Sequence, residues 1–232
     1  MPIKNFEDWL VENLNMNTEE MLMEYLNDGE TFALIGGAES ERTLRLVMNE
    51  LGSRNLLVIT AATAYKEETK EKYLKIFDDL GCDTAFIDAF DREEVDTEEE
   101  LLKLKVADTV FFVGGDQSRI VKAYLGTSFL NEMKRRVSEG MALIGTSAGA
   151  MAMSEVMIAG GKEAPIMSKG LSMLPNLIID THFQERDRKP RLEIAVGQVS
   201  EKIGLGISED TAIIFKGKQI LILGKSEIEV IE

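Results

Sequence analysis

The sequence predicts an α/β fold whose central sheet is mostly parallel, covered on both faces by helices and extended late in the chain by antiparallel strands. Short apolar runs alternate with helical stretches through most of the chain. The strand-like runs are residues 32–35, 56–59, 84–87, 109–113 and 142–144. Because parallel strands are joined by right-handed crossovers, this alternation predicts one sheet between two helical layers.

The segments between these runs have helical periodicity. Within residues 66–80, Tyr73, Leu74, Phe77 and Leu80 recur at helical spacing among lysines and glutamates. A helix packed on a sheet has this kind of apolar face.

After residue 203 the pattern changes. Short apolar segments are separated by Lys216-Gly217-Lys218 and Gly224-Lys225-Ser226. Such punctuation is typical of antiparallel strands. The predicted late strands are residues 211–215, 219–223 and 227–231.

The first thirty residues are predicted to be an N-terminal helical extension of a single domain that spans residues 1–232. A chain of 232 residues suits one domain with a sizeable core. We interpret the extension as two short helices packed on the sheet, with a contact in a homodimer as the alternative. Its apolar residues at helical spacing are Phe6, Trp9, Leu10, Leu14, Met21, Leu22, Tyr25 and Leu26.

The charge and composition of the chain exclude several classes of binding partner and of protein. The formal net charge is −15 and the isoelectric point is near 4.6, so nucleic acid and anionic membranes would be repelled. The single cysteine, Cys82, excludes an internal disulfide and is interpreted as a small buried residue. No segment has the ~20 consecutive apolar residues that a membrane span requires. We therefore expect a cytoplasmic protein.

Four loops are predicted to converge on one edge of the sheet. Gly36-Gly37, Thr60, Gly114-Gly115 and Ser147 each come directly after a predicted strand. Ligands bind open α/β sheets beyond the carboxyl ends of the strands. This edge is therefore the expected position of a site.

A nucleophilic serine is predicted at Ser147. The pentapeptide Gly145-Thr146-Ser147-Ala148-Gly149 lies between an apolar run and a stretch of small residues that suits a helix, which is the strand–turn–helix context of such serines. The backbone N–H of Ala148 and one from Gly115 would stabilise the oxyanion. The alternative is a glycine-lined turn that joins a core strand to a helix.

The base of such a serine is usually a histidine, and His182 is the chain's only one. It follows the apolar run 177–180 and lies within a densely charged segment, residues 180–192. A strand end followed by such a segment favours a site over an ordinary surface histidine.

Several segments together resemble the cyanophycinase branch of the serine peptidases, a family that also includes the aspartyl dipeptidases. They occur in the family's order and cover about residues 31 to 222. The segments are Ile35–Glu39, Thr60–Ala62, Phe112–Gln117, Gly145–Ala150, the His182 segment and Gly204–Ala212.

The resemblance implies a three-layer sandwich like that of the class I glutamine amidotransferases. It implies Glu209 as the carboxylate that orients His182, and Asp210 is the nearest rival. The order serine, histidine, glutamate along the chain differs from that of ordinary α/β-hydrolases. This chemistry needs no metal and no cofactor.

The resemblance also implies which residues contact the substrate. Gln117 would recognise a peptide carbonyl or carboxylate, although it could instead be an exposed residue in the first turn of a helix capped by Asp116. Arg186, Arg188 and Arg191 are suited to binding an aspartyl carboxylate of the substrate. The alternative is that they form a local salt-bridge network with Glu185, Asp187 and Glu193. Thr181 stands where cyanophycinases usually have glutamine. The candidate substrate-binding residues are Asp116, Gln117, Asp180, Thr181, Arg186, Arg188 and Arg191.

The main hypothesis is a cyanophycinase-like serine peptidase that cleaves aspartyl peptide bonds, with cyanophycin as one candidate substrate and β-Asp-Arg dipeptides as the product. The second is an aspartyl or isoaspartyl dipeptidase that acts on short peptides. A hypothesis from another class is a non-catalytic module that binds acidic or arginine-bearing peptides. A glutamine amidotransferase is disfavoured, because those related folds need cysteine at the position of Ser147.

Overall fold

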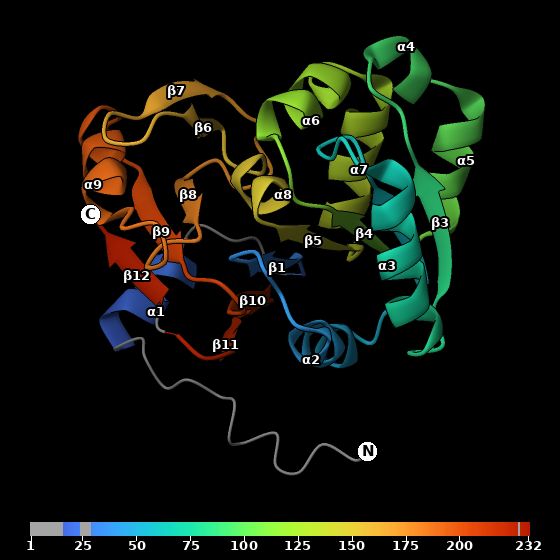
Figure 1. The fold of residues 1–232 in the computed structure, drawn as a ribbon, viewed down its shortest axis with the longest axis horizontal. Helices are drawn as coiled ribbons and strands as arrows, with labels where there is room; N and C mark the ends of the chain where they lie inside the picture. Colours follow the sequence, from blue (N-terminus) through green and yellow to red (C-terminus); the bar gives the residue numbers. More distant parts are fainter. Residues whose placement is uncertain (1–15, 24–28, 227) are drawn as a thin grey trace.

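The computed structural model describes residues 16–23, 29–226 and 228–232, and within them the main sheet has seven strands (Figure 1). Their order is β11-β10-β1-β5-β4-β2-β3. The five parallel strands are β1 (Thr31–Ile35), β2 (Asn55–Ile59), β3 (Asp83–Ile87), β4 (Thr109–Phe112) and β5 (Ala142–Thr146). All five predicted parallel strands are confirmed, with boundaries that differ by a residue or two.

The late segments form strands, but in two different sheets. The antiparallel strands β10 (Ala212–Lys216) and β11 (Gln219–Leu223) extend the main sheet beyond β1. The third, β12 (Ile228–Ile231), pairs instead with β9 (Ile203–Ile207). Together with β8 (Leu177–Thr181), these two strands make a second sheet of three strands in the order β12-β9-β8. The sequence pattern did not predict this second sheet.

A separate antiparallel hairpin, β6 (Val156–Gly160) and β7 (Ile166–Lys169), lies between α8 and β8 in the chain. The helices are α1 (Met16–Met23), α2 (Glu41–Leu51), α3 (Lys66–Asp78), α4 (Arg92–Val95), α5 (Glu98–Val106), α6 (Gln117–Tyr124), α7 (Ser128–Ser138), α8 (Ala148–Met151) and α9 (Lys189–Gly197).

Several helices begin where a side chain caps the first turn. The Ser40 hydroxyl accepts a hydrogen bond from the Thr43 N–H at the start of α2. The Thr127 hydroxyl does the same for α7, through the Leu130 N–H. Such caps satisfy N–H groups that have no partner inside the helix.

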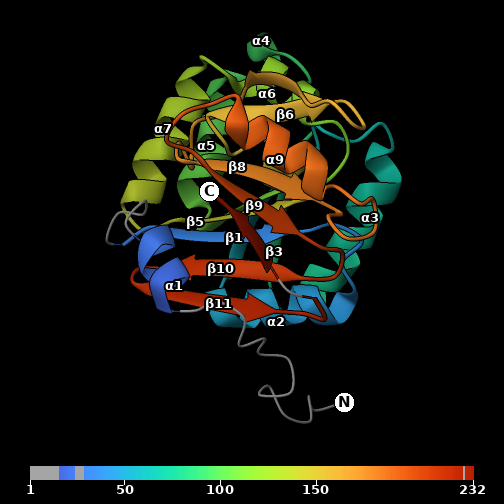
Figure 2. The same ribbon diagram turned by 90° about the vertical axis from the view of Figure 1, so that its left-hand side faces the viewer.

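Helices cover both faces of the main sheet, as the sequence predicts. Figures 1 and 2 show α2 and α3 on one face and α5, α6 and α7 on the other. The central strand β5 is buried along its whole length. Its Leu143 and Ile144 are fully buried, and burying a side chain of this size stabilises the fold by about 2 kcal/mol.

The small sheet lies between α9 and the main sheet (Figure 2). The helix α9 packs on β8, β9 and β12 through Leu192, Ala195 and Val196, which are buried. Because β8 and β9 are parallel neighbours, their carboxyl ends lie side by side. The residues that follow the two strands are thereby brought together.

At the N-terminus, α1 packs beside β11 and buries Leu22. Residues 1–15 and 24–28 of the predicted helical extension, among them Phe6, Trp9 and Tyr25, lie outside the described residues. Among the described helices, none combines the length and the apolar character needed to span a bilayer.

Candidate active site

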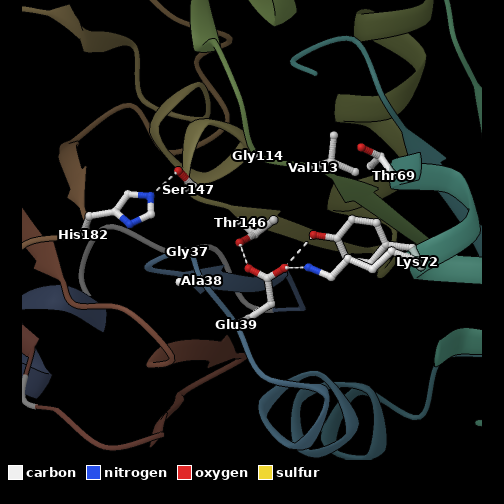
Figure 3. Close-up of a pocket in the computed structure, with 11 residues that line it drawn as sticks. Gly37, Ala38, Glu39, Thr69, Lys72, Val113, Gly114, Thr146, Ser147 and His182 are labelled. Carbon is white, nitrogen blue, oxygen red and sulfur yellow. Dashed lines mark hydrogen bonds and ion pairs between the residues drawn. The ribbon is translucent and has the colours of Figure 1, made fainter. Parts of the chain in front are cut away.

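A pocket of about 270 Å³ opens at the carboxyl edge of the main sheet, where the sequence predicts a site (Figure 3). The strands β1, β5 and β4 are neighbours in the sheet. The loops that follow them therefore meet, and they line the pocket with Gly37, Ser147 and Gly114. The helix α3 supplies the opposite wall.

Ser147 lies at a sharp turn between β5 and α8. Its φ of 50° and ψ of −114° are uncommon for a residue with a side chain. Its N–H donates a hydrogen bond of 2.9 Å to the Ile35 carbonyl, which fixes the turn against β1. A side chain at Gly149 would lie 2.3 Å from the Phe112 carbonyl oxygen, so this close return of the chain requires glycine.

His182 and Glu209 are brought to the serine by the small sheet. His182 follows β8, and Glu209 follows its parallel neighbour β9. The distance from Ser147 Oγ to His182 Nε2 is 2.8 Å, and that from His182 Nδ1 to Glu209 Oε1 is 2.6 Å. With the proton on Nδ1, the imidazole donates to Glu209 and accepts from the serine hydroxyl.

The rival carboxylate, Asp210, has other partners. Its Oδ1 accepts hydrogen bonds from the Ser40 N–H at 2.7 Å and the Thr43 hydroxyl at 2.6 Å, and Lys225 lies 2.7 Å from its Oδ2. Burial alone would raise the pKa of Asp210, but these partners lower it overall. Asp210 thus joins its loop to the start of α2, and Glu209 alone of the two contacts the imidazole.

The expected oxyanion groups lie in two loops beside Ser147. Ala148 is the first residue of α8, and Gly114 is near enough that a side chain there would lie 3.3 Å from Ser147 Cβ. The next residue, Gly115, has a φ of 143° and packs against the Ala62 carbonyl. The roles of Gly115 and Ala148 stay predictions.

Asp116 and Gln117 lie at the start of α6. The Asp116 carboxylate accepts a hydrogen bond of 2.8 Å from the Ser118 N–H. Asp116 therefore caps α6, as the alternative prediction from the sequence has it. The Gln117 side-chain amide donates a hydrogen bond of 2.7 Å to the Ile158 carbonyl on β6. Part of this amide's hydrogen-bonding capacity is therefore used within the protein.

The arginine segment divides into buried and exposed members. The fully buried Asp180 carboxylate accepts a hydrogen bond of 2.8 Å from Arg191 Nε and one of 2.9 Å from Arg188. Arg191 also donates to the Gly161 carbonyl at 2.6 Å. Burial lowers the pKa of Arg188, an effect that Asp180 opposes. Arg186, by contrast, is exposed.

These contacts bear on the substrate-binding predictions. Arg188 and Arg191 each pair with Asp180. The two arginines thus belong to a salt-bridge network, but its acid is Asp180 and not one of the three acids that the alternative named. Thr181 is fully buried, and its hydroxyl has no hydrogen-bond partner among the described residues. Of the three candidate arginines, Arg186 is the exposed one.

The opposite wall of the pocket holds a group of residues for which the sequence predicts no role in the site. The buried Glu39 carboxylate accepts hydrogen bonds from the Thr146 hydroxyl at 2.5 Å, the Tyr73 hydroxyl at 2.6 Å and Lys72 Nζ at 3.1 Å (Figure 3). Burial alone would raise the pKa of Glu39, but Lys72 and the two hydroxyl donors lower it overall. Burial raises the pKa of Tyr73 well above its ordinary value, and Glu39 adds to this effect.

A sequence signal for this group did exist. Glu39 ends the first segment of the family resemblance, and Tyr73 belongs to the apolar face predicted for residues 66–80. The link between them depends on which loop faces α3, and periodicity does not contain that information.

A serine, a histidine and a carboxylate linked in this way on an α/β sheet are typical of serine hydrolases. The model of peptidase family S51 matches residues 32–223. The chain therefore belongs to peptidase family S51 and is a serine-type peptidase.

Similar proteins agree with this assignment. A cyanophycinase from Trichormus variabilis is 32% identical over an alignment of 215 residues that covers 86% of this chain and 72% of that protein. A peptidase E from a Nostoc strain is 25% identical over an alignment of 219 residues. That alignment covers 90% of this chain and 86% of the Nostoc protein. The crystal structure of a peptidase from an acI-B1 actinobacterium has the same fold, with a TM-score of 0.74, 21% identity, and coverage of 90% and 93% of the two chains.

Proposed function

We propose that the protein is a cyanophycinase-like peptidase that hydrolyses aspartyl peptides through an acyl-enzyme on Ser147. The observation that carries the proposal is the continuous hydrogen-bonded series from Ser147 through His182 to Glu209 beside a pocket. In this arrangement the imidazole can take the serine proton while the carboxylate stabilises the charged ring.

The reaction follows from this geometry. Ser147 Oγ bonds to the scissile carbonyl carbon as its proton passes to His182 Nε2, and backbone N–H groups of Ala148 and Gly115 stabilise the oxyanion. The C–N bond then breaks, and His182 returns the proton to the leaving amine. In the second half of the reaction a water molecule hydrolyses the acyl-enzyme. Its proton goes to His182 as its oxygen attacks the ester carbonyl, and Ser147 then leaves with that proton.

The substrate proposal rests on the relatives. Cyanophycinases at 32–33% identity favour an aspartyl polymer that carries arginine, with β-Asp-Arg as the product. The peptidase E relative supports the second candidate, an aspartyl or isoaspartyl dipeptidase. A non-catalytic binding module is disfavoured, because it would not need the hydrogen-bonded series at Ser147.

A panel of substrates tests the proposal. Cyanophycin, β-aspartyl dipeptides, α-aspartyl dipeptides and their asparagine analogues are each incubated with the protein, and released amines are measured. We expect cleavage of at least one aspartyl substrate and roughly 10⁴-fold lower kcat in Ser147→Ala. Cleavage of α-aspartyl dipeptides alone would favour the dipeptidase. Hydrolysis of none, or equal hydrolysis of the asparagine analogues, would contradict the proposal.

Two features of the protein's setting stay predictions, namely location in the cytoplasm and assembly as a homodimer. The absence of nucleic-acid binding is a third, and it follows from the net charge of −15. Light scattering on the full chain measures the mass in solution, and a monomer would contradict the homodimer.

A further inference from the structure

Among the residues that the structure describes, one cation, Lys72, lines the pocket on the side away from His182. Figure 3 shows the Ser147–His182 pair on one side and Lys72, from α3, on the other. A substrate whose scissile carbonyl reaches Ser147 can place another of its groups in the space between them. The chemistry of that far wall therefore selects which group fits.

The far wall contains a carboxylate and an ammonium, and they differ in exposure. The Glu39 side chain is 4% exposed, whereas that of Lys72 is 50% exposed. Glu39 already accepts hydrogen bonds from Thr146, Tyr73 and Lys72. A cationic substrate group would have to displace these donors to reach it. The charge available to a ligand in the pocket is therefore the positive one.

Lys72 is held in position but not saturated. Its Nζ lies 3.1 Å from Glu39 Oε1 and 4.7 Å from the centre of the Tyr73 ring. An ammonium has three N–H donors. Among the described residues Glu39 is its acceptor, so two donors can serve a ligand.

We propose that Lys72 binds a carboxylate of the substrate, in a subsite whose position Glu39 and Tyr73 fix. This inference rests on the proposed peptidase function and names a subsite for it. Carboxylate recognition would then come from Lys72 on α3. Two of the three arginines expected to provide it, Arg188 and Arg191, are instead paired with Asp180.

Binding to catalytically silent protein tests the subsite without depending on turnover. The full chain carrying Ser147→Ala is titrated calorimetrically with β-aspartyl-arginine. It is also titrated with two analogues, each with one of the dipeptide's two carboxylates converted to an amide. We expect the free acid to bind roughly tenfold or more tightly than at least one amide, since charged hydrogen bonds are the strong ones.

Adding Lys72→Met to the Ser147→Ala protein should remove the preference for the free acid. The amide analogue that binds more weakly than the free acid should bind as before. The matched control is Lys75→Met, an exposed lysine on the same helix that does not line the pocket. Lys72→Gln serves as a second variant, and thermal unfolding checks that each protein is folded. A preference that survives in both folded Lys72 variants, or no binding of the free acid, overturns the inference.

The two proposals fail in distinguishable ways. Failure of the peptidase proposal appears as absence of hydrolysis by the unmodified protein across the panel. Failure of the subsite appears as an unchanged acid-over-amide preference in the Lys72 variants of the Ser147→Ala protein, while the unmodified protein does hydrolyse aspartyl substrates.

Discussion

Ser147 and its immediate neighbours hold a backbone geometry that is unfavourable on its own. A non-glycine residue at a φ of 50° with ψ of −114° costs about 1–3 kcal/mol. The Ile35 carbonyl holds the Ser147 N–H, and Glu39 holds the hydroxyl of the preceding residue, Thr146. These contacts keep the serine oxygen 2.8 Å from the imidazole in the free protein.

Replacement of Gly37 should separate the serine from its base. A Cβ at this position would lie 2.5 Å from His182 Cε1 and 3.1 Å from Ser147 Cβ. We expect Gly37→Ala to push the ring aside and lower kcat by roughly a hundredfold, because small displacements of reacting groups have large effects. Steady-state kinetics on the best-cleaved aspartyl substrate measures this.

Gly52→Ala is the matched control for Gly37→Ala. Gly52 also has positive φ, at 69°, but a Cβ there would meet nothing within 4 Å. Both variants should lose about 1 kcal/mol of stability from backbone strain, and only Gly37→Ala should lose activity. Equal kcat in the two variants would show that contact with His182 is unimportant.

Substitution of Glu209 should mainly lower kcat, whereas substitution of Asp210 should mainly lower stability. Glu209→Gln keeps the shape of the side chain but removes the charge beside His182 Nδ1, so kcat should fall by roughly a hundredfold or more with little change in stability. Asp210→Asn should mainly lower the free energy of unfolding, because Asp210 accepts from Ser40 and Thr43. A larger kcat loss from Asp210→Asn would reassign the orienting role.

At the scale of the elements, a buried ion pair joins β8 to α9. Asp180 lies on β8, two residues before His182, and Arg191 lies in the first turn of α9. Both side chains are buried, so removing one partner leaves an unpaired buried charge. The pair therefore holds the strand end that carries the base.

Arg191→Met should lower the free energy of unfolding by about 3 kcal/mol, whereas Arg186→Met should change it by less than about 0.5 kcal/mol. The reason is that Arg186 is exposed and Arg191 is buried. Urea unfolding followed by circular dichroism gives both values. Similar small effects from the two substitutions would contradict a structural role for Arg191.

For the whole molecule, stability should fall in acid in part through Glu39. The folded-state pKa of Glu39 lies below its ordinary value of 4.5, so the unfolded chain binds this proton first. Its contribution is therefore fully present above that value and is lost as the pH falls through the folded-state pKa. Asp88 and Asp210 have lowered pKa values and act in the same direction.

Glu39→Gln should be less stable than the unmodified protein near neutral pH, with the difference shrinking as the pH falls below 4.5. Urea unfolding at several pH values measures that difference. Glu71→Gln, an exposed glutamate on α3, is the control and should show no such trend. A Glu39 difference that is constant with pH would contradict a charged carboxylate in the folded state.

Periodicity predicted the parallel strands, and with them the edge where Gly37, Gly114 and Ser147 meet, because those features depend on local pattern. It did not predict that β12 leaves the main sheet or that β8 and β9 form a sheet of their own. Strand pairing between distant segments is a tertiary choice that local pattern does not encode. The neighbouring positions of His182 and Glu209 depend on that pairing.

The substrate side of the site was less predictable. Asp180, Arg188 and Arg191 appeared as a charged segment in the sequence, which does not distinguish a buried ion pair from a ligand site. Lys72 appeared as one lysine among several on a helix. Its position opposite Ser147 follows only when α3 is packed against the loop that carries Glu39.

Covalent labelling of the full chain by a serine-directed fluorophosphonate, followed by intact mass and peptide mapping, tests whether Ser147 is the nucleophile. We expect one label per chain, on Ser147, and no label in Ser147→Ala. Labelling should be much slower in His182→Ala, because the imidazole activates the hydroxyl. Labelling at another serine, or an unchanged rate in folded His182→Ala, would contradict the assignment of Ser147 as a nucleophile activated by His182.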